Sequence, residues 1–362
     1  MNMRVVVAGG GIVGCMTALE LKNRGCEVTL VDRNVVASQT SGESSWAGAG
    51  ILFPLLPWMY ADAVNQLTMA GAAIYPEFCE ELLAETGIDP EYRCSGMLLL
   101  PTFDMAQALQ WSARQGIEAQ PVPAAAYPSL LSPKGDTALW LPRVGQVRPP
   151  NVLQALRAYL LKRGVRLLER TELKPLQMQD ELQRWETLTG EILRADRFVV
   201  TSGAWSFDLL KETAARLKIK PMRGQILLYQ QPPGGLQHMV YREGFYMVPR
   251  RDGVMLAGST LEDVGFDPGT TEDVRVEMQA KAEAILPALK QQPVLKHWSG
   301  LRPGTPENLP AICEHPQVAN LYLNTGHFRY GLTMAPAAAR MAAALICGEK
   351  PMLDPAPFSL KD

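Results

Sequence analysis

The sequence predicts an α/β protein in which a Rossmann-like nucleotide-binding domain, assembled from discontinuous segments, is joined to an α+β domain built on an antiparallel sheet. Three observations predict this fold class. A strand, glycine turn and helix open the chain, similar strand and turn patterns recur in its middle and near its end, and the segments between them contain short strand candidates. A length of 362 residues also favours two domains over one.

The first glycine turn has the pattern of a dinucleotide-binding site. Residues 3–8 form a β-branched run, Gly9-Gly10-Gly11-Ile12-Val13-Gly14 follows at once, and a helical pattern continues through Leu21. The first glycine of such a turn permits the tight bend, the second lets the backbone approach a pyrophosphate, and the third lets the helix pack closely on the strand. The N–H groups at the start of the helix face the phosphates. The candidate cofactor-binding residues here are Gly9, Gly11, Ile12, Val13 and Gly14.

A second strand, predicted over residues 26–31, ends in an acidic residue, Asp32, which follows Gly14 by eighteen positions. A carboxylate at this place accepts hydrogen bonds from ribose hydroxyls and repels the additional phosphate of NADP. Asp32 and the adjacent Arg33 are therefore further candidates for cofactor binding. This fingerprint alone does not distinguish FAD from NAD, because both present an adenosine diphosphate to the turn.

The composition argues for a small-molecule partner. Apolar residues make up 47% of the chain, charged residues 20%, and the formal net charge is -2, so nothing favours binding to nucleic acid or to an anionic membrane. The apolar stretch 46–61 contains Pro54 and Pro57 and is too short and too broken for a transmembrane helix. No membrane span is expected.

The cysteines indicate a reducing compartment and no metal site. Six cysteines are scattered without a CxxC pair, which is typical of small buried apolar residues rather than of metal ligands. The chain opens in a strand-like run without a secretory leader, so a cytoplasmic location is expected.

Three further motifs extend the pattern beyond the fingerprint. Residues 38–52 are mostly small or hydroxylated, residues 197–206 combine a strand with a glycine turn, and the pair 298–310 and 324–332 is rich in glycine and proline. With these motifs the chain resembles the glycine oxidases of thiamine biosynthesis, within the D-amino-acid oxidase family of FAD-dependent oxidoreductases. The resemblance runs nearly end to end and is weakest over residues 55–140.

The resemblance implies a non-covalently bound FAD. Relatives that attach flavin covalently use a cysteine just after the equivalent of Arg302, whereas the nearest cysteine here, Cys313, lies eleven residues further on. Backbone N–H groups near Gly331 and Leu332, at the start of a predicted helix, would stabilise the reduced flavin. The further cofactor contacts that the resemblance implies are Ser44, Ser45, Ala49, Gly50, Ile51, Leu173, Gly203, Trp205, His327, Phe328, Arg329, Tyr330, Gly331 and Leu332.

The resemblance also implies a set of substrate-binding residues. Arg302 would anchor the substrate carboxylate, since a guanidinium binds a carboxylate through two parallel hydrogen bonds. Tyr246 would join it, and Arg329 would line the substrate cavity; a surface arginine, a core tyrosine and a structural arginine are the alternatives. Phe245 follows a glycine where some relatives carry a polar residue, which leaves the preferred amine open.

Three functions fit these residues. The first is oxidative deamination of glycine or a similar small amine or D-amino acid by hydride transfer to flavin, giving imine and glyoxylate, ammonia and hydrogen peroxide, with dioxygen as acceptor and thiazole synthesis for thiamine as the use. The second is a D-amino-acid or secondary-amine dehydrogenase that passes electrons to a quinone or protein. The third is a flavin-binding assembly subunit without turnover. Family analogy alone suggests a homo-oligomer, often a homotetramer.

The positions of the motifs predict the domain division. Cofactor motifs lie at the beginning, in the middle and at the end of the chain, which assigns residues 1–87, 142–220 and 298–362 to the FAD-binding domain. The intervening residues 88–141 and 221–297 are assigned to the substrate-binding domain. The active site is expected where the two domains meet.

Overall fold

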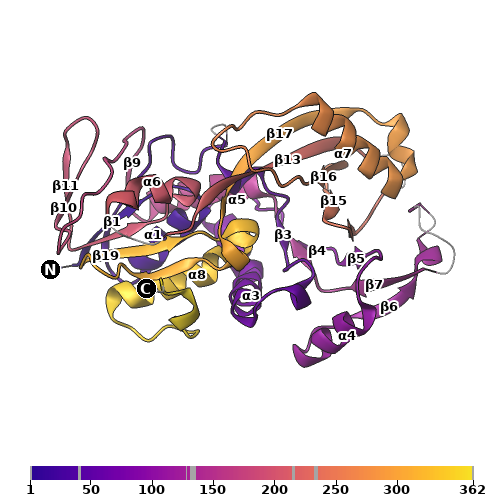
Figure 1. Cartoon of the computed structure of the whole chain (residues 1–362), viewed down its shortest axis with the longest axis horizontal. Helices are drawn as coiled ribbons and strands as arrows, with labels where there is room; N and C mark the ends of the chain where they lie inside the picture. Colours follow the sequence, from indigo (N-terminus) through magenta and orange to yellow (C-terminus); the bar gives the residue numbers. More distant parts are fainter. Residues whose placement is uncertain are drawn as a thin grey trace.

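A computed structural model describes residues 2–39, 42–127, 129–130, 136–213, 217–231 and 235–360. Its described residues form two large sheets that lie toward opposite ends of an elongated molecule (Figure 1). One end carries both chain termini and a mainly parallel sheet, and the other carries a mainly antiparallel sheet. The predicted fold class is confirmed by this arrangement.

The sheet near the termini has six strands among the described residues, in the order β18-β19-β12-β1-β2-β9. All neighbouring pairs are parallel except β18 and β19. The strands come from the beginning, middle and end of the chain, as the positions of the motifs predict. They are β1 (Arg4–Ala8), β2 (Glu27–Val31), β9 (Arg166–Leu168), β12 (Arg197–Val200), β18 (Ala311–Glu314) and β19 (Leu321–Thr325).

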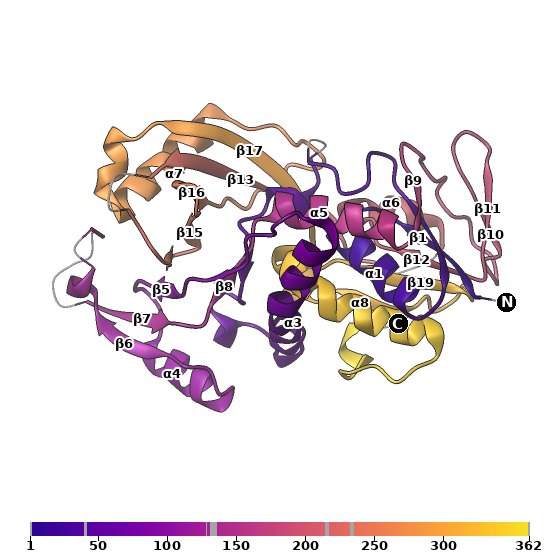
Figure 2. The ribbon, with the colours of Figure 1, turned by 180° about the vertical axis from the view of Figure 1, so that it is seen from behind.

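Both faces of this sheet are buried. Val5 and Val7 of β1 face a core shared with four helices, whereas Val6 and Ala8 face a second core, as the alternation of side chains along a strand requires. Figure 2 shows the helices of the first core gathered beside the sheet. They are α1 (Ile12–Asn23), α3 (Asp62–Thr86), α5 (Pro149–Lys162) and α8 (Gly331–Cys347).

The second core lies under the hairpin of β10 (Arg184–Glu186) and β11 (Ile192–Arg194) and the short helix α6 (Ser206–Leu210). The sequence predicts this hairpin over residues 178–189, but its turn lies later, because Gly190 supplies the positive φ of +89° that the turn needs. Trp185 of the hairpin packs edge-on against Phe198 of the sheet. The hairpin therefore packs on the parallel sheet.

The second large sheet has eight strands among the described residues, in the order β17-β13-β16-β15-β14-β5-β7-β6. Its pairings are antiparallel except for that of β14 with β5, two strands from distant segments, which is parallel. The strands are β5 (Met97–Leu99), β6 (Gln120–Pro123), β7 (Thr137–Leu141), β13 (Lys220–Gln230), β14 (Met239–Arg242), β15 (Phe245–Pro249), β16 (Val254–Gly258) and β17 (Val294–Gly304).

Helices and short elements complete the chain. Helix α7 (Glu272–Ile285) packs on one face of the eight-stranded sheet and α4 (Met105–Arg114) on the other. A small sheet of β3 (Ile51–Leu52), β8 (Gly145–Gln146) and β4 (Arg93–Cys94) lies between the two large sheets, and α2 (Ser44–Ala47) precedes it. The 3₁₀ turns are η1 (Pro57–Met59), η2 (Ala124–Ala126), η3 (Gly203–Trp205), η4 (Lys211–Thr213), η5 (Pro287–Gln291), η6 (Pro306–Asn308), η7 (Phe328–Tyr330) and η8 (Ala356–Phe358).

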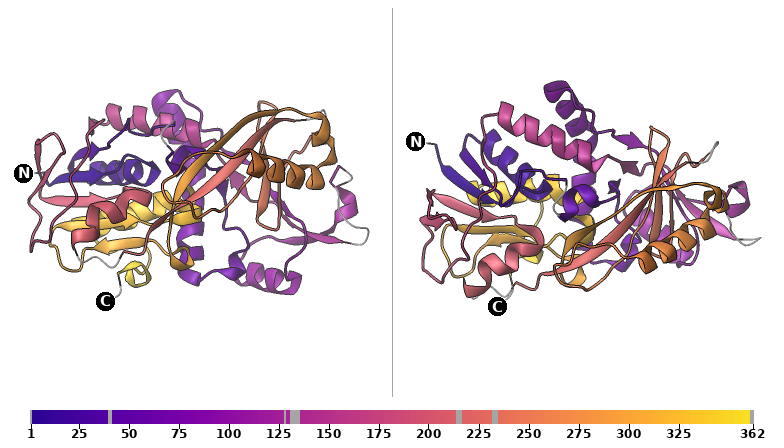
Figure 3. Two further views of the ribbon diagram at one scale, coloured as in Figure 1. Left: turned by 45° about the horizontal axis from the view of Figure 1, so that its top comes forward. Right: turned by 90° about the horizontal axis from the view of Figure 1, so that it is seen from above.

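Strands β13 and β17 connect the two halves of the molecule. They pair antiparallel from Lys220 with Gly304 through to Tyr229 with Val294. In Figure 3 the salmon and orange ribbons of this pair extend from the outer sheet to the side of the parallel sheet. The predicted domain boundaries after residues 220 and 297 therefore fall inside β13 and β17, and the division of the chain into domains stays a prediction.

One helical stretch in the described part of the chain, Phe328–Cys347, is long and apolar enough to cross a membrane by length and composition alone. Its most apolar window is 72% buried inside the protein, as in the core helix of a globular domain. Residues 46–61, which the sequence singles out as apolar, instead form parts of α2 and the short elements β3 and η1.

The contact between α3 and α8 gives a first prediction. A Cβ on Gly71 of α3 would lie 2.0 Å from the carbonyl oxygen of Thr333 in α8. Helix propensity favours alanine over glycine by about 1 kcal/mol, but overpacking costs about 1–3 kcal/mol. We expect Gly71→Ala to lower the free energy of unfolding by about 1–2 kcal/mol in urea denaturation. Ala73→Gly, on the exposed side of α3, measures the propensity term alone; a more stable Gly71→Ala protein would contradict the close packing.

Candidate active site

A cavity of about 740 Å³ lies where the parallel sheet meets β13, β15 and β17. This volume is within the range of about 300–1,000 Å³ found for small-molecule sites. The cavity is lined by Arg302, Tyr246 and Arg329 and by all the predicted cofactor-binding residues except Gly14. The predicted cofactor residues in its wall are Gly9, Gly11, Ile12, Val13, Asp32, Arg33, Ser44, Ser45, Ala49, Gly50, Ile51, Leu173, Gly203, Trp205, His327, Phe328, Arg329, Tyr330, Gly331 and Leu332.

The glycines of the first turn are required by close backbone contacts. Gly9 has a φ of +114°, and a Cβ there would lie 2.7 Å from the backbone of Ser202. A Cβ on Gly14 would lie 1.8 Å from the carbonyl oxygen of Gly9. Gly14 therefore lies behind the cavity wall and allows α1 to pack on β1. This is the role that the glycine pattern assigns to its third glycine.

The N-terminus of α1 faces the cavity. The helix begins after Gly11 without a side-chain cap, and the N–H of Ile12 donates a hydrogen bond of 3.0 Å to the Ser45 hydroxyl. Helix N-termini bind phosphate because their N–H groups and the helix dipole favour negative charge. Hydroxyl and N–H donors thus meet where a pyrophosphate would lie.

Asp32 lies at the end of β2 beside this helix. Its carboxylate accepts hydrogen bonds from the N–H of Gly10 at 2.6 Å and from that of Asn34 at 2.7 Å. Burial raises the pKa of Asp32, and the two N–H donors oppose the rise only in part. Each carboxylate oxygen keeps a second lone pair, so the group can still accept hydroxyl donors from a ribose.

Next to Asp32 the wall is flat and aromatic. The guanidinium carbon of Arg33 lies 4.0 Å from the ring centroid of Trp205, and Trp205 stacks on Phe266 with ring centroids 5.6 Å apart. Planar groups of this kind suit contact with planar rings or with ribose. Leu173 lines the cavity as well.

The segment that follows Asp32 is fixed by a buried arginine that the sequence analysis leaves unassigned. Arg250 donates to the carbonyl oxygens of Ala49 and Val147 and to Oε1 of Gln146, each at 2.8 Å. Burial lowers the pKa of Arg250 to about 10. Gly50 has a φ of +72°, and a Cβ there would lie 2.0 Å from Val147 O. Thr40 and Ser41 of the predicted segment lie outside the described residues.

A second helix N-terminus, that of α8, meets the cavity at Gly331. The preceding turn is held by Tyr330, whose hydroxyl donates to the carbonyl oxygen of Leu55 and accepts from its N–H, both at 3.1 Å. Among the described residues, two buried polar atoms of the cavity wall have no hydrogen-bond partner, Nε2 of His327 and Oδ1 of Asn324. Buried polar atoms normally have partners, so these two fit a bound group that carries polar atoms of its own.

The three predicted substrate residues come together from different elements. Arg302 projects from β17, Tyr246 from β15 and Arg329 from η7. Burial lowers the pKa of Arg302, the nearby Tyr246 hydroxyl raises it, and the positive charge of Arg329 lowers it. Arg302 is partly buried within a strand, which excludes the alternative of a surface arginine at a turn.

The guanidinium of Arg302 is held in one place. Its Nη1 donates to the carbonyl oxygen of Thr260 at 3.1 Å, and its Nη2 donates to the hydroxyl of Ser259 at 2.8 Å. On β13, a Cβ on Gly224 would lie 1.9 Å from Nη1, so only glycine leaves room for the guanidinium. A glycine inside a strand is a known sign of such close approach, and the sequence analysis does not use it.

The wall contains other residues that the sequence analysis misses or leaves without a role. Tyr241 of β14 lies opposite Tyr246 in the strand register, lines the cavity, and accepts a hydrogen bond of 3.0 Å from the N–H of Gly244. Met59 and Tyr60 line the cavity as well. Pairing of β14 with β15 could have been predicted from the Glu-Gly turn between them, and it would have revealed Tyr241.

No metal site is found in the part of the chain that the structure describes, where no three His, Cys, Asp or Glu side chains are grouped to hold an ion. None of the six cysteines lines the cavity, and Cys313 is buried in β18. The cavity wall therefore offers no thiol for covalent attachment of a cofactor.

A glycine turn, a carboxylate at the end of β2 and two helix N-termini meet at one cavity, as in dinucleotide-binding α/β proteins, and a partly buried arginine, Arg302, lies in the wall of the same cavity. The chain matches the family model described as FAD dependent oxidoreductase (DAO) over residues 4–345, and it belongs to this family. The cofactor is FAD and the protein is an enzyme, as predicted. The donor set described above fits this cofactor.

Individual relatives support the predicted resemblance to glycine oxidases. A glycine oxidase of Pseudomonas aeruginosa is 40% identical over 365 residues, which cover 99% of each chain. A bifunctional protein ThiO/ThiG of Nostoc sp. is 31% identical over 97% of this chain and 53% of its own length. The crystal structure of glycine oxidase from Geobacillus kaustophilus superimposes with a TM-score of 0.91 at 27% identity, covering 99% of both chains.

Burial of His327 gives a prediction for pH dependence. Desolvation lowers its pKa to about 3 in the folded protein, whereas an unfolded histidine titrates near about 6.5. The unfolded chain binds the extra proton between these values, so stability falls as the pH drops through this window. We expect the slope of unfolding free energy against pH to be smaller in His327→Asn than in the wild type, by up to about 1.4 kcal/mol per pH unit. Identical slopes from urea denaturation at pH 4–7 would contradict it.

Proposed function

We propose that this enzyme oxidises glycine or a similarly small amine or D-amino acid, producing imine and then glyoxylate, ammonia and hydrogen peroxide, and that it supplies thiazole synthesis for thiamine. The observation that carries the proposal is the guanidinium of Arg302, which faces the cofactor cavity together with Tyr246 and Arg329. Relatives named glycine oxidase and ThiO/ThiG support the same substrate and use.

Arg302 binds the substrate carboxylate in this proposal. A guanidinium has five N–H donors, and two of the nitrogens of Arg302 already donate to Ser259 and Thr260. The remaining N–H groups form a fork for a carboxylate, and the Tyr246 hydroxyl adds a donor beside it. Fixing the carboxylate fixes the position of the substrate Cα.

The charges of the wall act on the amine. Arg302 and Arg329 both line the cavity, and positive charge disfavours an ammonium group. The substrate amine is therefore held neutral, the form that can be oxidised. Bound FAD supplies a hydride acceptor for the substrate Cα–H, and the protein contributes mainly by orientation, so no additional catalytic base is required.

Aromatic side chains favour a small substrate. Tyr241 and Tyr246 are buried, line the cavity and lie opposite each other in the strand register, whereas Phe245 packs with α7 in the core on the other face of the sheet. In this proposal the rings of Tyr241 and Tyr246 limit the room for a bulky substrate side chain. Glycine is therefore our preferred substrate, with sarcosine and D-proline as the nearest alternatives.

The electron acceptor, the location and the assembly are proposed on the resemblance. Dioxygen is the proposed acceptor, and a quinone or protein acceptor would make the enzyme a dehydrogenase. The proposed location is the cytoplasm, and the proposed assembly is a homo-oligomer. A flavin-binding subunit without turnover is not favoured, because such a subunit has no use for a carboxylate-binding wall.

Steady-state assays with glycine test the activity. We expect hydrogen peroxide release in air, and bleaching of the flavin absorbance by glycine under anaerobic conditions. Dye reduction without peroxide would indicate the dehydrogenase instead. If glycine, sarcosine and D-proline all leave the anaerobic flavin oxidised, the proposed activity is wrong.

Substitution of Arg302 tests the carboxylate anchor. Truncating one partner of a buried charged hydrogen-bond pair costs about 2–5 kcal/mol, so Arg302→Ala should raise the KM for glycine by about 30-fold or more. Arg302→Lys keeps the charge but loses the fork and should give an intermediate KM. Lys296→Ala, at an exposed position of the same strand, is the matched control. An unchanged KM for Arg302→Ala would remove this residue from the substrate site.

A further inference from the structure

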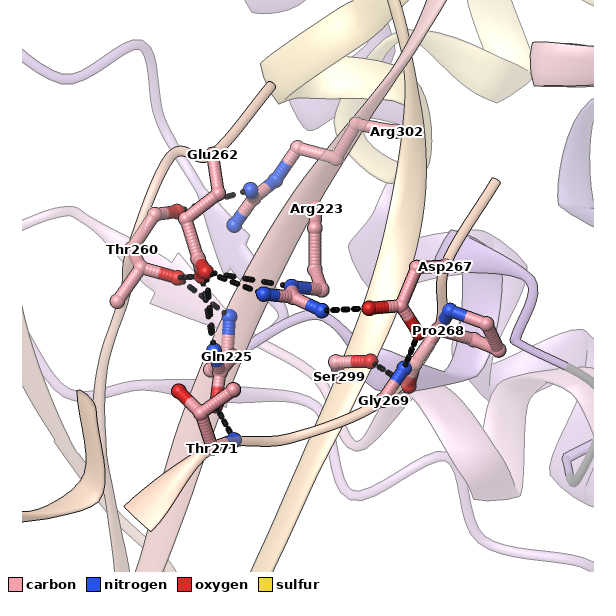
Figure 4. A network of polar contacts seen from close by, with 10 residues as sticks. All are labelled: Arg223, Gln225, Thr260, Glu262, Asp267, Pro268, Gly269, Thr271, Ser299 and Arg302. Atoms are coloured by element: carbon pink, nitrogen blue, oxygen red, sulfur yellow. Dashed lines mark hydrogen bonds and ion pairs between the residues drawn. The ribbon is translucent and has the colours of Figure 1, made fainter. Parts of the chain in front are cut away.

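We infer that Glu262, paired with Arg223, is a positioning residue for Arg302 and orients its guanidinium toward the substrate carboxylate. This inference rests on the proposed function of Arg302. It concerns residues 259–271, which connect β16 to α7 and are called the strap below. Figure 4 shows the strap beside β13 and β17, with Arg302 next to the Glu262–Arg223 pair.

The strap is anchored to β13 by its backbone. The N–H of Arg223 donates to the carbonyl oxygen of Glu262, and the N–H of Glu262 donates to that of Arg223, both at 2.9 Å. This reciprocal pair is an isolated antiparallel bridge. It places the Glu262 side chain directly beside Arg223.

Glu262 is the centre of a partly buried polar network. The side chain of Arg223 is only 4% exposed, and its Nη2 and Nε lie 2.7 and 3.2 Å from Oε2 of Glu262. Gln225 donates to both carboxylate oxygens, at 2.9 and 3.1 Å. Burial raises the pKa of Glu262, but the hydrogen bonds from Arg223, Thr260 and Gln225 outweigh it, so the pKa lies below its usual value. The carboxylate is therefore charged at neutral pH.

Thr260 and Ser259 of the strap connect Glu262 to Arg302 through hydrogen bonds. The hydroxyl of Thr260 donates to Oε1 of Glu262 at 2.5 Å and accepts from the N–H of Gln225 at 2.8 Å. The carbonyl oxygen of the same Thr260 accepts from Nη1 of Arg302, and the adjacent Ser259 hydroxyl accepts from Nη2. Glu262 thus fixes the residue that supplies an acceptor to the guanidinium.

The other side of Arg302 is closed by the same strand that carries Arg223. Gly224, the next residue of β13, lies against the guanidinium. Arg302 is consequently confined between β13 and the strap, and Glu262 joins these two. Without its charge, Arg223 would be a buried cation with only Asp267, at 2.7 Å and 60% exposed, as a partner.

Measurements on the holoenzyme separate this positioning role from a general structural role. Acetate, which has the carboxylate but no amine, is the binding probe, and its Kd is obtained from perturbation of the flavin absorbance. We expect Glu262→Gln to raise the Kd for acetate and the KM for glycine by about tenfold, within the coupling typical of contacting residues. The kcat and the FAD content should change little, whereas the thermal midpoint should fall, because Arg223 loses a charged partner.

A double-mutant cycle provides the decisive comparison. If Glu262 acts through Arg302, Glu262→Gln should change the acetate Kd by less than about twofold when Arg302 is already alanine. Glu272→Gln, which breaks the exposed pair with Arg275 at the end of the strap, is the matched control and should leave the Kd unchanged. An equal effect of Glu262→Gln in both backgrounds, or none in the wild type, would overturn the inference.

Thr260 provides a test that survives if Glu262→Gln does not fold. Thr260→Val removes the hydroxyl that links Glu262 to the strap and should raise the acetate Kd, whereas Thr260→Ser keeps the hydroxyl and should restore it. Equal Kd values for the two variants would count against the inference. If wild-type enzyme and Arg302→Ala bind acetate and glycine equally, the proposed function of Arg302 is wrong. This outcome differs from those that contradict only the role of Glu262.

Discussion

The contact of Arg302 with Gly224 depends on the pairing of β13 with β17, and the arrangement of the cavity depends on that contact. A guanidinium that leaves water needs hydrogen-bond acceptors for its donors and counter-charge for its cation. Backbone and hydroxyl oxygens of the strap meet the first need, and Glu262 contributes to the second, which a substrate carboxylate would complete in the proposed function. Because the acceptors come from the strap, the glycine from β13 and the arginine from β17, none of the three can shift without the others.

The nucleotide half of the fold could be predicted because its signals are local. Gly9, Gly14 and Asp32 lie within the first 32 residues, and each is fixed by neighbours from the same strand–helix–strand unit or from the adjacent turn at Ser202. The parallel pairing of β5 with β14 could not be predicted, because no turn joins the two strands. The sequence composition does not change at the predicted domain boundaries, because strands β13 and β17 continue across them.

The residues of the candidate site also divide into those that could be predicted from the sequence and those that could not. The resemblance brought Arg302, Tyr246 and Arg329 to one cavity although they project from three elements. The residues that fix Arg302 and the Ala49 segment could not be predicted, because Glu262 precedes Arg302 by forty positions in the chain and Arg250 contacts Ala49 across about two hundred. From the sequence alone, a charged residue whose partner is distant in the chain cannot be distinguished from an ordinary surface residue. Gly224 carries a usable signal, because a glycine inside a strand often marks a close approach of another group.

The long ribbon of β13 and β17 also restricts how substrate reaches the cavity. The two strands are paired from the outer sheet to the side of the nucleotide-binding half, with one register shift between Leu228 and Tyr229. A hinge between the halves would have to break this backbone ladder, whereas typical hinge motion uses a few loop residues. Small molecules would therefore reach the cavity past the short turns in its wall, such as the one that carries Met59, rather than through a hinge opening between the halves.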